Sequence, residues 1–137
     1  MGRILAIDYG EKRIGLAVTD PLQIIATPLD TIDNGKIWDY LREYIKKESV
    51  EAIVIGLPLS LKSEDTTTTV LVRSFAEKLA ALFPDLPLHW EDERFSSKIA
   101  QETMIAGGTS KKYRKEKGNL DKISATIILQ SFLAKKT

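Results

Sequence analysis

The amino-acid sequence predicts an α/β fold: a five-stranded mixed sheet whose first three strands form an antiparallel meander, with helices on both faces. Three observations support this prediction. Two short apolar runs near the start of the sequence flank a turn, and a third run at residues 51–56 is continuous and β-branched, as in a strand buried on both faces. Apolar residues recur at helical spacing in three further segments.

Composition limits the kind of site that the chain can carry. Its 137 residues, 43% of them hydrophobic, fit one domain over residues 1–137. The sequence has no cysteine and a single histidine, His89, so any metal must be held by oxygen ligands. No apolar run approaches the roughly 20 residues of a membrane-spanning helix, and we expect a cytoplasmic protein that does not enter membranes.

The first third of the sequence predicts three strands. Residues 3–8 and 13–19 are apolar runs joined by a short connection in which Gly10 favours a turn, and this pattern predicts a β-hairpin. Residues 23–32 predict a third strand. Its Pro28 has no backbone N–H to donate and is tolerated mainly at the edge of a sheet, so we expect this strand to be outermost.

The middle of the sequence predicts two helices around the buried strand 51–56. Residues 36–47 have apolar side chains at helical spacing after an Asp-Asn-Gly start signal. A second helix is expected from about Thr66, as a capping residue, to Leu82. The side of this helix that faces the sheet is expected to contain Val70, Phe75, Leu79 and Leu82.

The last third predicts a fifth strand at residues 88–94 and further helices. The strand ends in three consecutive acids, and a helix is expected from residue 96 or 97 to about residue 105. Residues 109–118 predict a basic loop, and Asn119 is expected to cap a final helix over residues 121–134. The positions of that helix suited to docking on the sheet are Ile123, Ile127, Ile128 and Phe132.

Acids at the ends of three predicted elements are the candidates for chemistry. Asp8 ends the first strand, Glu91, Asp92 and Glu93 end the fifth, and Asp121 stands in the first turn of the last helix. Each has a simpler interpretation: aspartate is common in turns, an acidic run can be a solvated cluster, and a carboxylate at a helix start interacts favourably with the dipole. Alternation places Glu91 and Glu93 on one face of the strand and Asp92 on the other.

Taken together, these acids predict a metal site. Asp8, one of Asp92 or Glu93, and Asp121 would supply three carboxylates from three elements, a set that suits Mg²⁺ or Mn²⁺. Clustered carboxylates repel one another unless cations offset their charge. Two ions about 4 Å apart could activate a water and stabilise the leaving oxygen of a phosphodiester without histidine or cysteine.

A basic segment precedes the last candidate acid. Residues 111–117 hold five cations and one acid, although the net charge of the whole chain is only +1. Such a segment suits contacts to a phosphate backbone with little reading of base sequence. A solvated loop explains the charge about equally well. Arg94 could pair with an acid or contact a phosphate.

Four short motifs, in this order and spacing, resemble one known family. They are Ile7-Asp8-Tyr9-Gly10 with Arg13-Ile-Gly-Leu-Ala17, then Gly56-Leu-Pro58, then Asp92-Glu-Arg94 followed by Ser96-Ser97, then Asp121-Lys-Ile-Ser-Ala125. The chain resembles, from Arg3 to about Leu133, the YqgF/RuvX family of Holliday-junction resolvases, also described as pre-16S ribosomal RNA nucleases.

The resemblance implies a ribonuclease-H-like fold and metal-dependent hydrolysis of phosphodiester bonds in structured nucleic acid. The substrate would be the 5′ end of precursor 16S ribosomal RNA, within ribosome biogenesis, or branched DNA. The implied catalytic acids are Asp8, Asp92, Glu93 and Asp121, of which Asp8, Glu93 and Asp121 are the expected metal ligands. The residues expected to bind nucleic acid are Arg13 and Arg94, by resemblance, and Lys111, Lys112, Arg114 and Lys115, by charge.

Two departures from the family pattern stand out. The loop after Gly-Leu-Pro, residues 60–65, lacks the glycine that the family usually has there. Residues 52–56 contain no acid, whereas relatives of this fold usually place one on the fourth strand, so the fifth strand supplies it here.

Other functions fit parts of the sequence. Asp8-Tyr9-Gly10 also resembles the phosphate-binding start of sugar kinases and actin-like ATPases, but those need two such domains closing on ATP. A non-catalytic RNA-binding factor that joins pre-ribosomal particles through residues 111–117 is a third possibility. The sequence leaves open a monomer or a homodimer, since cutting two strands symmetrically would favour a dimer.

Overall fold

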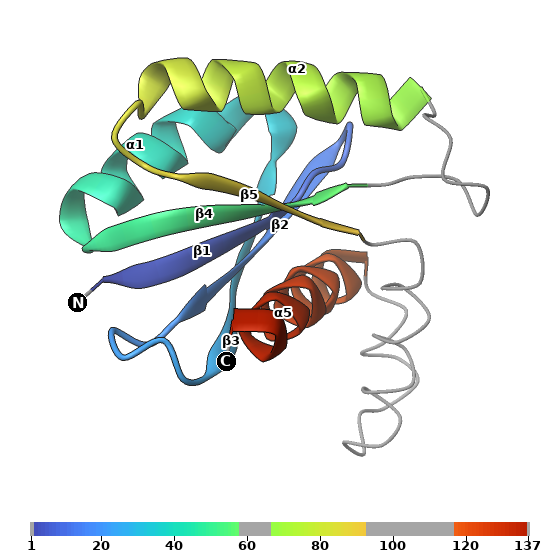
Figure 1. Ribbon diagram of the computed structural model, residues 1–137. Helices are drawn as coiled ribbons and strands as arrows, with labels where there is room; N and C mark the ends of the chain where they lie inside the picture. The colour runs from blue at the N-terminus through green and yellow to red at the C-terminus, as the bar shows by residue number, and fades with distance from the viewer. Residues whose placement is uncertain (1, 58–66, 93–116, 137) are drawn as a thin grey trace.

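The computed structural model describes residues 2–57, 67–92 and 117–136, and in the last segment it describes side chains from Lys122 to Lys135 (Figure 1). The predicted helix near residues 96–105 lies outside this part of the chain. In chain order the elements are β1 Arg3–Asp8, β2 Arg13–Thr19, β3 Ala26–Asp33, the 3-10 turn η1 Asn34–Lys36, α1 Ile37–Lys47, β4 Val50–Leu57, α2 Thr67–Leu82, β5 Leu88–Asp92 and α5 Lys117–Lys136.

The five strands form one mixed sheet in the order β3-β2-β1-β4-β5. β1 and β2 pair antiparallel, as do β2 and β3, while β4 is parallel to both β1 and β5. The predicted meander and mixed sheet are therefore confirmed. β3 is an edge strand, as Pro28 predicted, and the register of its pairing shifts between Leu16 and Ala17, beside that proline.

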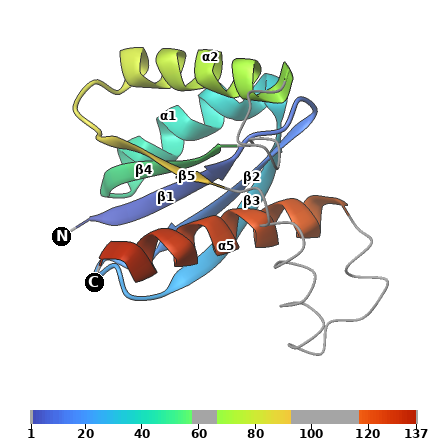
Figure 2. The ribbon, with the colours of Figure 1, turned by 45° about the vertical axis from the view of Figure 1, so that its right-hand side comes forward.

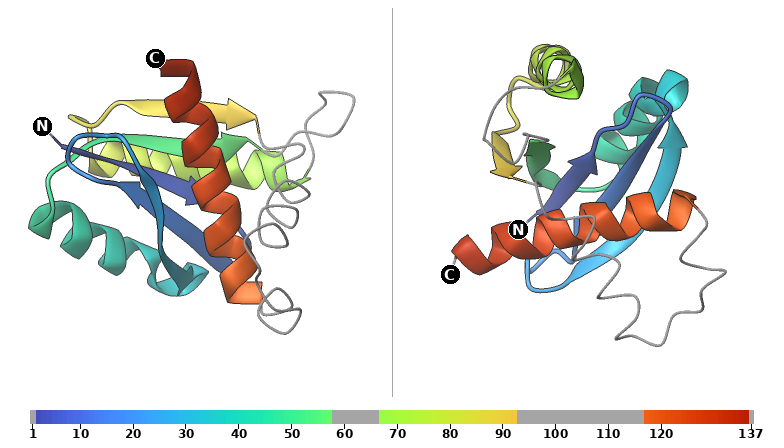
Figure 3. Two further views of the ribbon diagram at one scale, coloured as in Figure 1. Left: turned by 90° about the horizontal axis from the view of Figure 1, so that it is seen from below. Right: turned by 90° about the vertical axis from the view of Figure 1, so that its right-hand side faces the viewer.

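Helices cover both faces of the sheet, as the sequence predicts. α1 and α2 lie on one face and α5 crosses the other (Figures 2 and 3). The larger core cluster fills the space between the sheet and the first two helices. Its fully buried side chains include Leu5, Ile7, Leu16, Ile53 and Ile55 from the strands and Ile37, Leu41, Val72 and Leu79 from the helices.

The core under α5 contains smaller side chains. Ala6 on β1, Ala17 on β2 and Ala125 on the helix belong to this cluster, and such short side chains let a helix approach a sheet closely. Of the four positions predicted to dock, Ile128 belongs to this cluster and Phe132 packs against it. Ile127 is buried outside the cluster and Ile123 is only partly buried.

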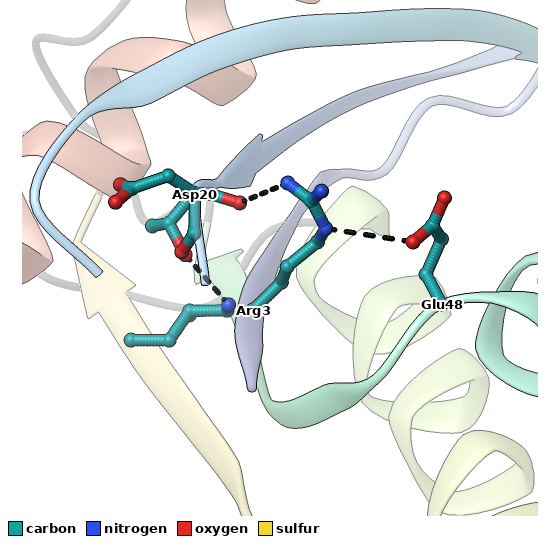
Figure 4. A network of polar contacts seen from close by, with 5 residues as sticks. Arg3, Asp20 and Glu48 are labelled. Atoms are coloured by element: carbon teal, nitrogen blue, oxygen red, sulfur yellow. Dashed lines mark hydrogen bonds and ion pairs between the residues drawn. The ribbon is translucent and has the colours of Figure 1, made fainter. Parts of the chain in front are cut away.

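Polar contacts join the elements at the edge where β1 begins. Arg3 donates to the Thr19 carbonyl oxygen at 3.0 Å, and its Nε lies 3.7 Å from a carboxylate oxygen of Glu48 (Figure 4). The N–H of Ile4 donates to the Thr19 hydroxyl, which in turn donates to the Asp20 carbonyl oxygen. The start of β1, the end of β2 and the segment before β4 are thereby tied together.

The third strand begins three residues later than predicted, at Ala26. The Asp20 carboxylate accepts hydrogen bonds from the N–H groups of Ile24 and Ile25, both at 2.8 Å, and Gln23 has a positive φ of 59°. These apolar residues therefore close a turn around an aspartate side chain instead of extending the strand.

The buried side of α2 is the predicted one at only two of its four positions. Phe75 and Leu79 are buried as expected, but Val70 is 57% exposed and Leu82 is 36% exposed. Thr69 is fully buried in place of Val70. The sheet therefore faces Thr69, Val72, Phe75, Ala76 and Leu79, a side that shares its middle with the predicted one and differs at the two ends of the helix.

The last helix begins four residues earlier than predicted, at Lys117. Asn119 is therefore inside the helix and is not its N-cap, and Asp121 lies in the second turn instead of the first. Each residue added to an existing helix gains one hydrogen bond, so a helix can extend through a residue that is common at caps.

Within the described residues, no helix is long and apolar enough to cross a membrane.

Candidate active site

Asp8 is the last residue of β1, and the turn that follows it is tightly constrained. A Cβ atom at Gly10 would lie 2.3 Å from the carbonyl oxygen of Arg13, so only glycine fits there. Asn34 braces the same turn from η1: its side-chain amide donates to the Gly10 carbonyl oxygen at 2.8 Å, and its N–H donates to the Lys12 carbonyl oxygen at 2.9 Å. The turn between Asp8 and Arg13 is therefore fixed by the close approach of Gly10 to Arg13 and by the two hydrogen bonds from Asn34.

Asp8 stands at the edge of the sheet where three parallel strands end. β1, β4 and β5 point the same way, so their carboxyl ends meet at one edge (Figure 1). Gly56 pairs with Glu91 and follows the partner of Ile7, so Asp8, Gly56 and Glu91 lie in one row. Neighbouring strands are about 4.8 Å apart, and β4 lies between β1 and β5, so the Cα atoms of Asp8 and Glu91 are about 10 Å apart. Glycine places no side chain between them.

The two described acids at the end of β5 face opposite sides of the sheet. Glu91 contacts α5, whereas Trp90 lines a groove against α2, and Asp92 follows the alternation to the side of Trp90. Asp8 alternates with Ala6, which packs under α5. Asp8 and Glu91 therefore share the α5 face, and Asp92 belongs to the other.

Glu91 is a buried acid with partners on α5. Its side chain is 4% exposed, and its carboxylate accepts hydrogen bonds from Lys135 Nζ at 2.5 Å and from Ser131 Oγ at 3.1 Å. The cation balances the buried charge and the hydroxyl satisfies the same oxygen. Glu91 therefore joins the end of β5 to the last turns of α5.

The other predicted site residues are described only in part. Arg13 begins β2, is partly buried and pairs in register with Asp33. The backbone of Asp121 lies in α5, whose first residues lie toward the edge where β1, β4 and β5 end (Figures 1 and 2). Its side chain lies outside the described part of the chain, as do Glu93, Arg94, Lys111, Lys112, Arg114 and Lys115.

The described acids do not by themselves form a metal centre. Among residues 2–57, 67–92 and the described side chains of α5, no group of three or more Asp, Glu or His residues could hold a metal ion. Asp8 is the one predicted metal ligand whose side chain is described. It is a carboxylate on a braced strand end, which is the donor type that Mg²⁺ and Mn²⁺ prefer.

Two residues that shape this edge were not identified from the sequence. The sequence pattern indicates Asn34 only as part of a helix start signal, whereas in the structure its side chain braces the turn after Asp8. Glu91 was grouped with the candidate acids, although it pairs within the fold. Ser131 and Lys135 stand four residues apart, so both lie on one side of a helix. That spacing is the signal that could have indicated a buried acid opposite them.

Comparisons with known proteins agree with the fold and name a family. The model of the family RuvX, described as Holliday junction resolvase, matches residues 2–135. A protein of Amoebophilus asiaticus is 53% identical over 134 residues, covering 98% of this chain and 95% of that protein. One of Porphyromonas gingivalis is 50% identical over 133 residues, covering 97% and 96%. Both carry the name "Putative pre-16S rRNA nuclease".

Solved structures confirm the architecture. Thermus thermophilus RuvC in complex with a Holliday junction substrate superposes with a TM-score of 0.60 at 19% identity, covering 99% of this chain and 96% of that one. A second Thermus thermophilus RuvC structure gives 0.58 at 17% identity, covering 98% and 96%. The chain has a ribonuclease-H-like fold, and it belongs to the RuvX Holliday junction resolvase family.

Proposed function

We propose that this protein is a metal-dependent nuclease that hydrolyses phosphodiester bonds in structured nucleic acid, and that it trims the 5′ end of precursor 16S ribosomal RNA in the cytoplasm. The observation that carries the proposal is the placement of Asp8. In a chain of this family, a carboxylate sits at the edge where three parallel strands end, on a turn braced by Asn34.

The proposed metal ligands are Asp8, Glu93 and Asp121, with Asp92 as a further catalytic acid. The side of the sheet on which each acid lies supports this choice. Asp92 lies on the α2 face and Asp8 on the α5 face, so we assign the metal to Glu93, the other member of the Asp92-Glu93 pair. Glu91 is left out because Lys135 already balances its charge.

This ligand set consists only of carboxylate oxygens, which fits Mg²⁺ or Mn²⁺ and a two-ion site. When bound there, such ions would lower the pKa of a water and stabilise the leaving oxygen of the phosphodiester. The role of the chain is to hold the carboxylates on separate rigid elements. Asp8 serves this role through its short, braced turn.

Phosphate groups of the substrate would be held by cations around the same edge. Arg13 follows the Asp8 turn directly and is the described member of the group. The remaining members, assigned from the sequence, are Arg94, Lys111, Lys112, Arg114 and Lys115. Contacts of this kind position the nucleic-acid backbone on the protein and give an affinity that depends on salt concentration.

The names of the relatives support precursor 16S ribosomal RNA as the substrate. We further propose that the protein meets this RNA within pre-ribosomal particles. A second candidate activity is resolution of branched DNA. It is favoured by the description of the matching family and by the structural likeness to a RuvC bound to a Holliday junction. Resolution would require a homodimer to cut two strands symmetrically, whereas trimming one RNA end requires only a monomer.

Single-turnover cleavage tests the proposal. Wild type, Asp8→Asn and Asp39→Asn would each be offered a precursor 16S 5′-end RNA and a four-way DNA junction with Mg²⁺ or Mn²⁺. Asp39 is a matched control because its side chain is 91% exposed on α1. We expect Asp8→Asn to lose activity by a factor of roughly 10³ or more while keeping affinity, and Asp39→Asn to cut like wild type.

Each outcome has a definite meaning. Cleavage of only the RNA, abolished by chelator and restored by Mg²⁺ or Mn²⁺, supports the proposal, and cleavage of only the junction selects resolution. Metal-independent cleavage would exclude the proposed chemistry. A protein that binds the RNA tightly and cuts neither substrate would be a non-catalytic assembly factor.

A further inference from the structure

A groove of about 520 Å³ lies between α2 and the edge strand β5. Leu57 and Leu88 line it from the sheet, and Ala76 and Ala80 line it from the helix. Leu57 ends β4 and pairs in register with Asp92, the last residue of β5. The groove therefore opens on the α2 face of the sheet beside Asp92, at the same edge of the sheet as Asp8, which lies on the α5 face.

Trp90 makes this groove unusual. Its side chain is 43% exposed although it belongs to a strand, and it lines the groove from β5. An exposed tryptophan in an apolar groove offers a flat surface for stacking, and nucleobases stack on such surfaces in proteins that bind single strands. Trp90 is two residues before Asp92 on the same face of the strand.

Two charged residues of α2 complete the lining. Arg73 and Glu77 are four residues apart on the helix and both line the groove. A guanidinium can bind a phosphate oxygen, and a carboxylate can accept a hydrogen bond from the amino group of a base. One cation, one acid and one aromatic ring are too few for a duplex backbone, but they match the phosphate, the amino edge and the flat face of the base of a single nucleotide.

We propose that this groove is a subsite for one unpaired nucleotide beside the scissile bond, with its base stacked on Trp90 and its phosphate at Arg73. The inference rests on the proposed nuclease function, because it is the catalytic edge that brings a strand past the groove. It gives the enzyme a preference for substrates in which single-stranded nucleotides flank the cleavage site.

Intrinsic fluorescence tests the stacking without requiring cleavage. The chain has two tryptophans, and Trp38, which is not among the residues lining the groove, packs against Phe75 with ring centroids 4.9 Å apart. Short single-stranded oligonucleotides would be titrated into wild type, Trp90→Phe and Trp38→Phe. We expect quenching in wild type and Trp38→Phe, and none in Trp90→Phe. Equal quenching in Trp90→Phe, or none in wild type once anisotropy shows saturation, would overturn the inference.

Affinity gives a second readout. Trp90→Ala should weaken binding of an oligonucleotide by about tenfold, with Trp90→Phe restoring most of the loss, because phenylalanine can still stack. Leu82→Ala is the matched control, since Leu82 is exposed on the same helix but does not line the groove. Arg73→Gln should lower the salt slope by about 0.7, whereas Arg73→Lys should keep it.

Cleavage separates this inference from the function on which it rests. On a substrate with unpaired nucleotides beside the cut, Trp90→Ala should raise KM about tenfold with little change in kcat, and on a fully paired substrate it should change neither. Normal cleavage with an unchanged KM would overturn the subsite alone. Quenching at Trp90 in a protein that cuts nothing would keep the subsite and overturn the nuclease proposal.

Discussion

Glu91 on β5 and Lys135 on α5, which are 44 residues apart in the sequence, form an ion pair of 2.5 Å, and the Glu91 side chain is only 4% exposed. Lys135 keeps 69% of its side chain exposed, so the pair is buried on the acid side alone. Among the contacts of the described residues, removing the lysine would leave the buried carboxylate with the hydrogen bond from Ser131 alone.

The first prediction concerns this pair. Lys135→Met should lower the free energy of unfolding by about 1–3 kcal/mol, because a buried charge loses its balance. Adding Glu91→Gln should recover part of the loss. Urea unfolding of the single and double variants measures the coupling. Arg42→Met, which breaks the exposed pair with Asp39 on α1, should cost less than about 0.5 kcal/mol. Equal losses in Lys135→Met and Arg42→Met would contradict the prediction.

The second prediction concerns the turn after Asp8. Gly10→Ala should cost about 1–3 kcal/mol, because its Cβ would collide with the Arg13 carbonyl oxygen. It should also reduce cleavage, since the turn must move and Asp8 with it. Gly35→Ala is the control, because nothing lies within 4 Å of a Cβ there. Urea unfolding and single-turnover cleavage measure the two effects. Normal cleavage by Gly10→Ala would show that the position of Asp8 does not depend on the conformation of this turn.

The third prediction concerns acid stability. Hydrogen bonds from the N–H of Ile25 and then of Ile24 lower the pKa of Asp20 below its ordinary value of 3.8. A carboxyl whose pKa is lower in the folded state stabilises the fold above its unfolded pKa. That contribution is lost as pH falls through the folded value. Asp20→Asn should therefore be less stable than wild type at neutral pH, and the difference should shrink below pH 3.8.

Urea unfolding across an acidic pH series measures the effect of Asp20→Asn. The control is Asp39→Asn, whose carboxylate is 91% exposed on α1. A difference between wild type and Asp20→Asn that stayed constant down to the lowest pH would argue against the role given to Asp20.

The fourth prediction concerns alkaline stability. Burial, then the charge of Asp30, then Tyr44 raise the pKa of Tyr40 to about 12 from 10.0. A group whose pKa is raised on folding stabilises the fold below its unfolded pKa, and this contribution disappears as pH rises through the folded value. Stability should therefore fall between pH 10 and about 12, and less so in Tyr40→Phe. Ultraviolet titration of the phenols should show a late transition that Tyr40→Phe removes.

The fifth prediction concerns the basic segment. Neutralising Lys111, Lys112 and Arg114 with glutamine should weaken nucleic-acid binding about equally for all sequences. The salt slope should fall by about one for each cation that contacts a phosphate. Lys46→Gln with Lys47→Gln on α1 is the control for lost charge alone. Fluorescence anisotropy at several salt concentrations measures the slope of affinity against salt. An unchanged slope would show that these three residues do not contact phosphate.

Local patterns were sufficient where one signal dominated. The bounds of β1 and β2 were predicted to the residue, because each is an uninterrupted apolar run between polar turns. Pro28 correctly indicated an edge strand, since a residue without an N–H cannot pair on both sides. The motifs that resemble the family likewise depended on residue identity and spacing alone.

Predictions failed where a side-chain hydrogen bond or packing against the sheet outweighed the hydropathy pattern of a segment. Ile24 and Ile25 have strand-like side chains, but the Asp20 carboxylate binds their N–H groups and turns the chain. Thr69 replaced Val70 in the core because the position of the sheet, and not hydropathy, decides which side of α2 is buried. The cap predicted at Asn119 lies within α5.

The sequence by itself determined the class of fold, the order of the strands in the meander, the family resemblance and the oxygen-only chemistry of any metal site, because these depend on composition, period and spacing. Only the tertiary structure decided which acids share a face. In the sequence, Glu91, Asp92 and Asp8 are all acids at the end of a predicted strand. The sheet register and the packing of α5 give them different partners. Such partners are set by burial and pairing between segments far apart in the chain, which no local pattern records.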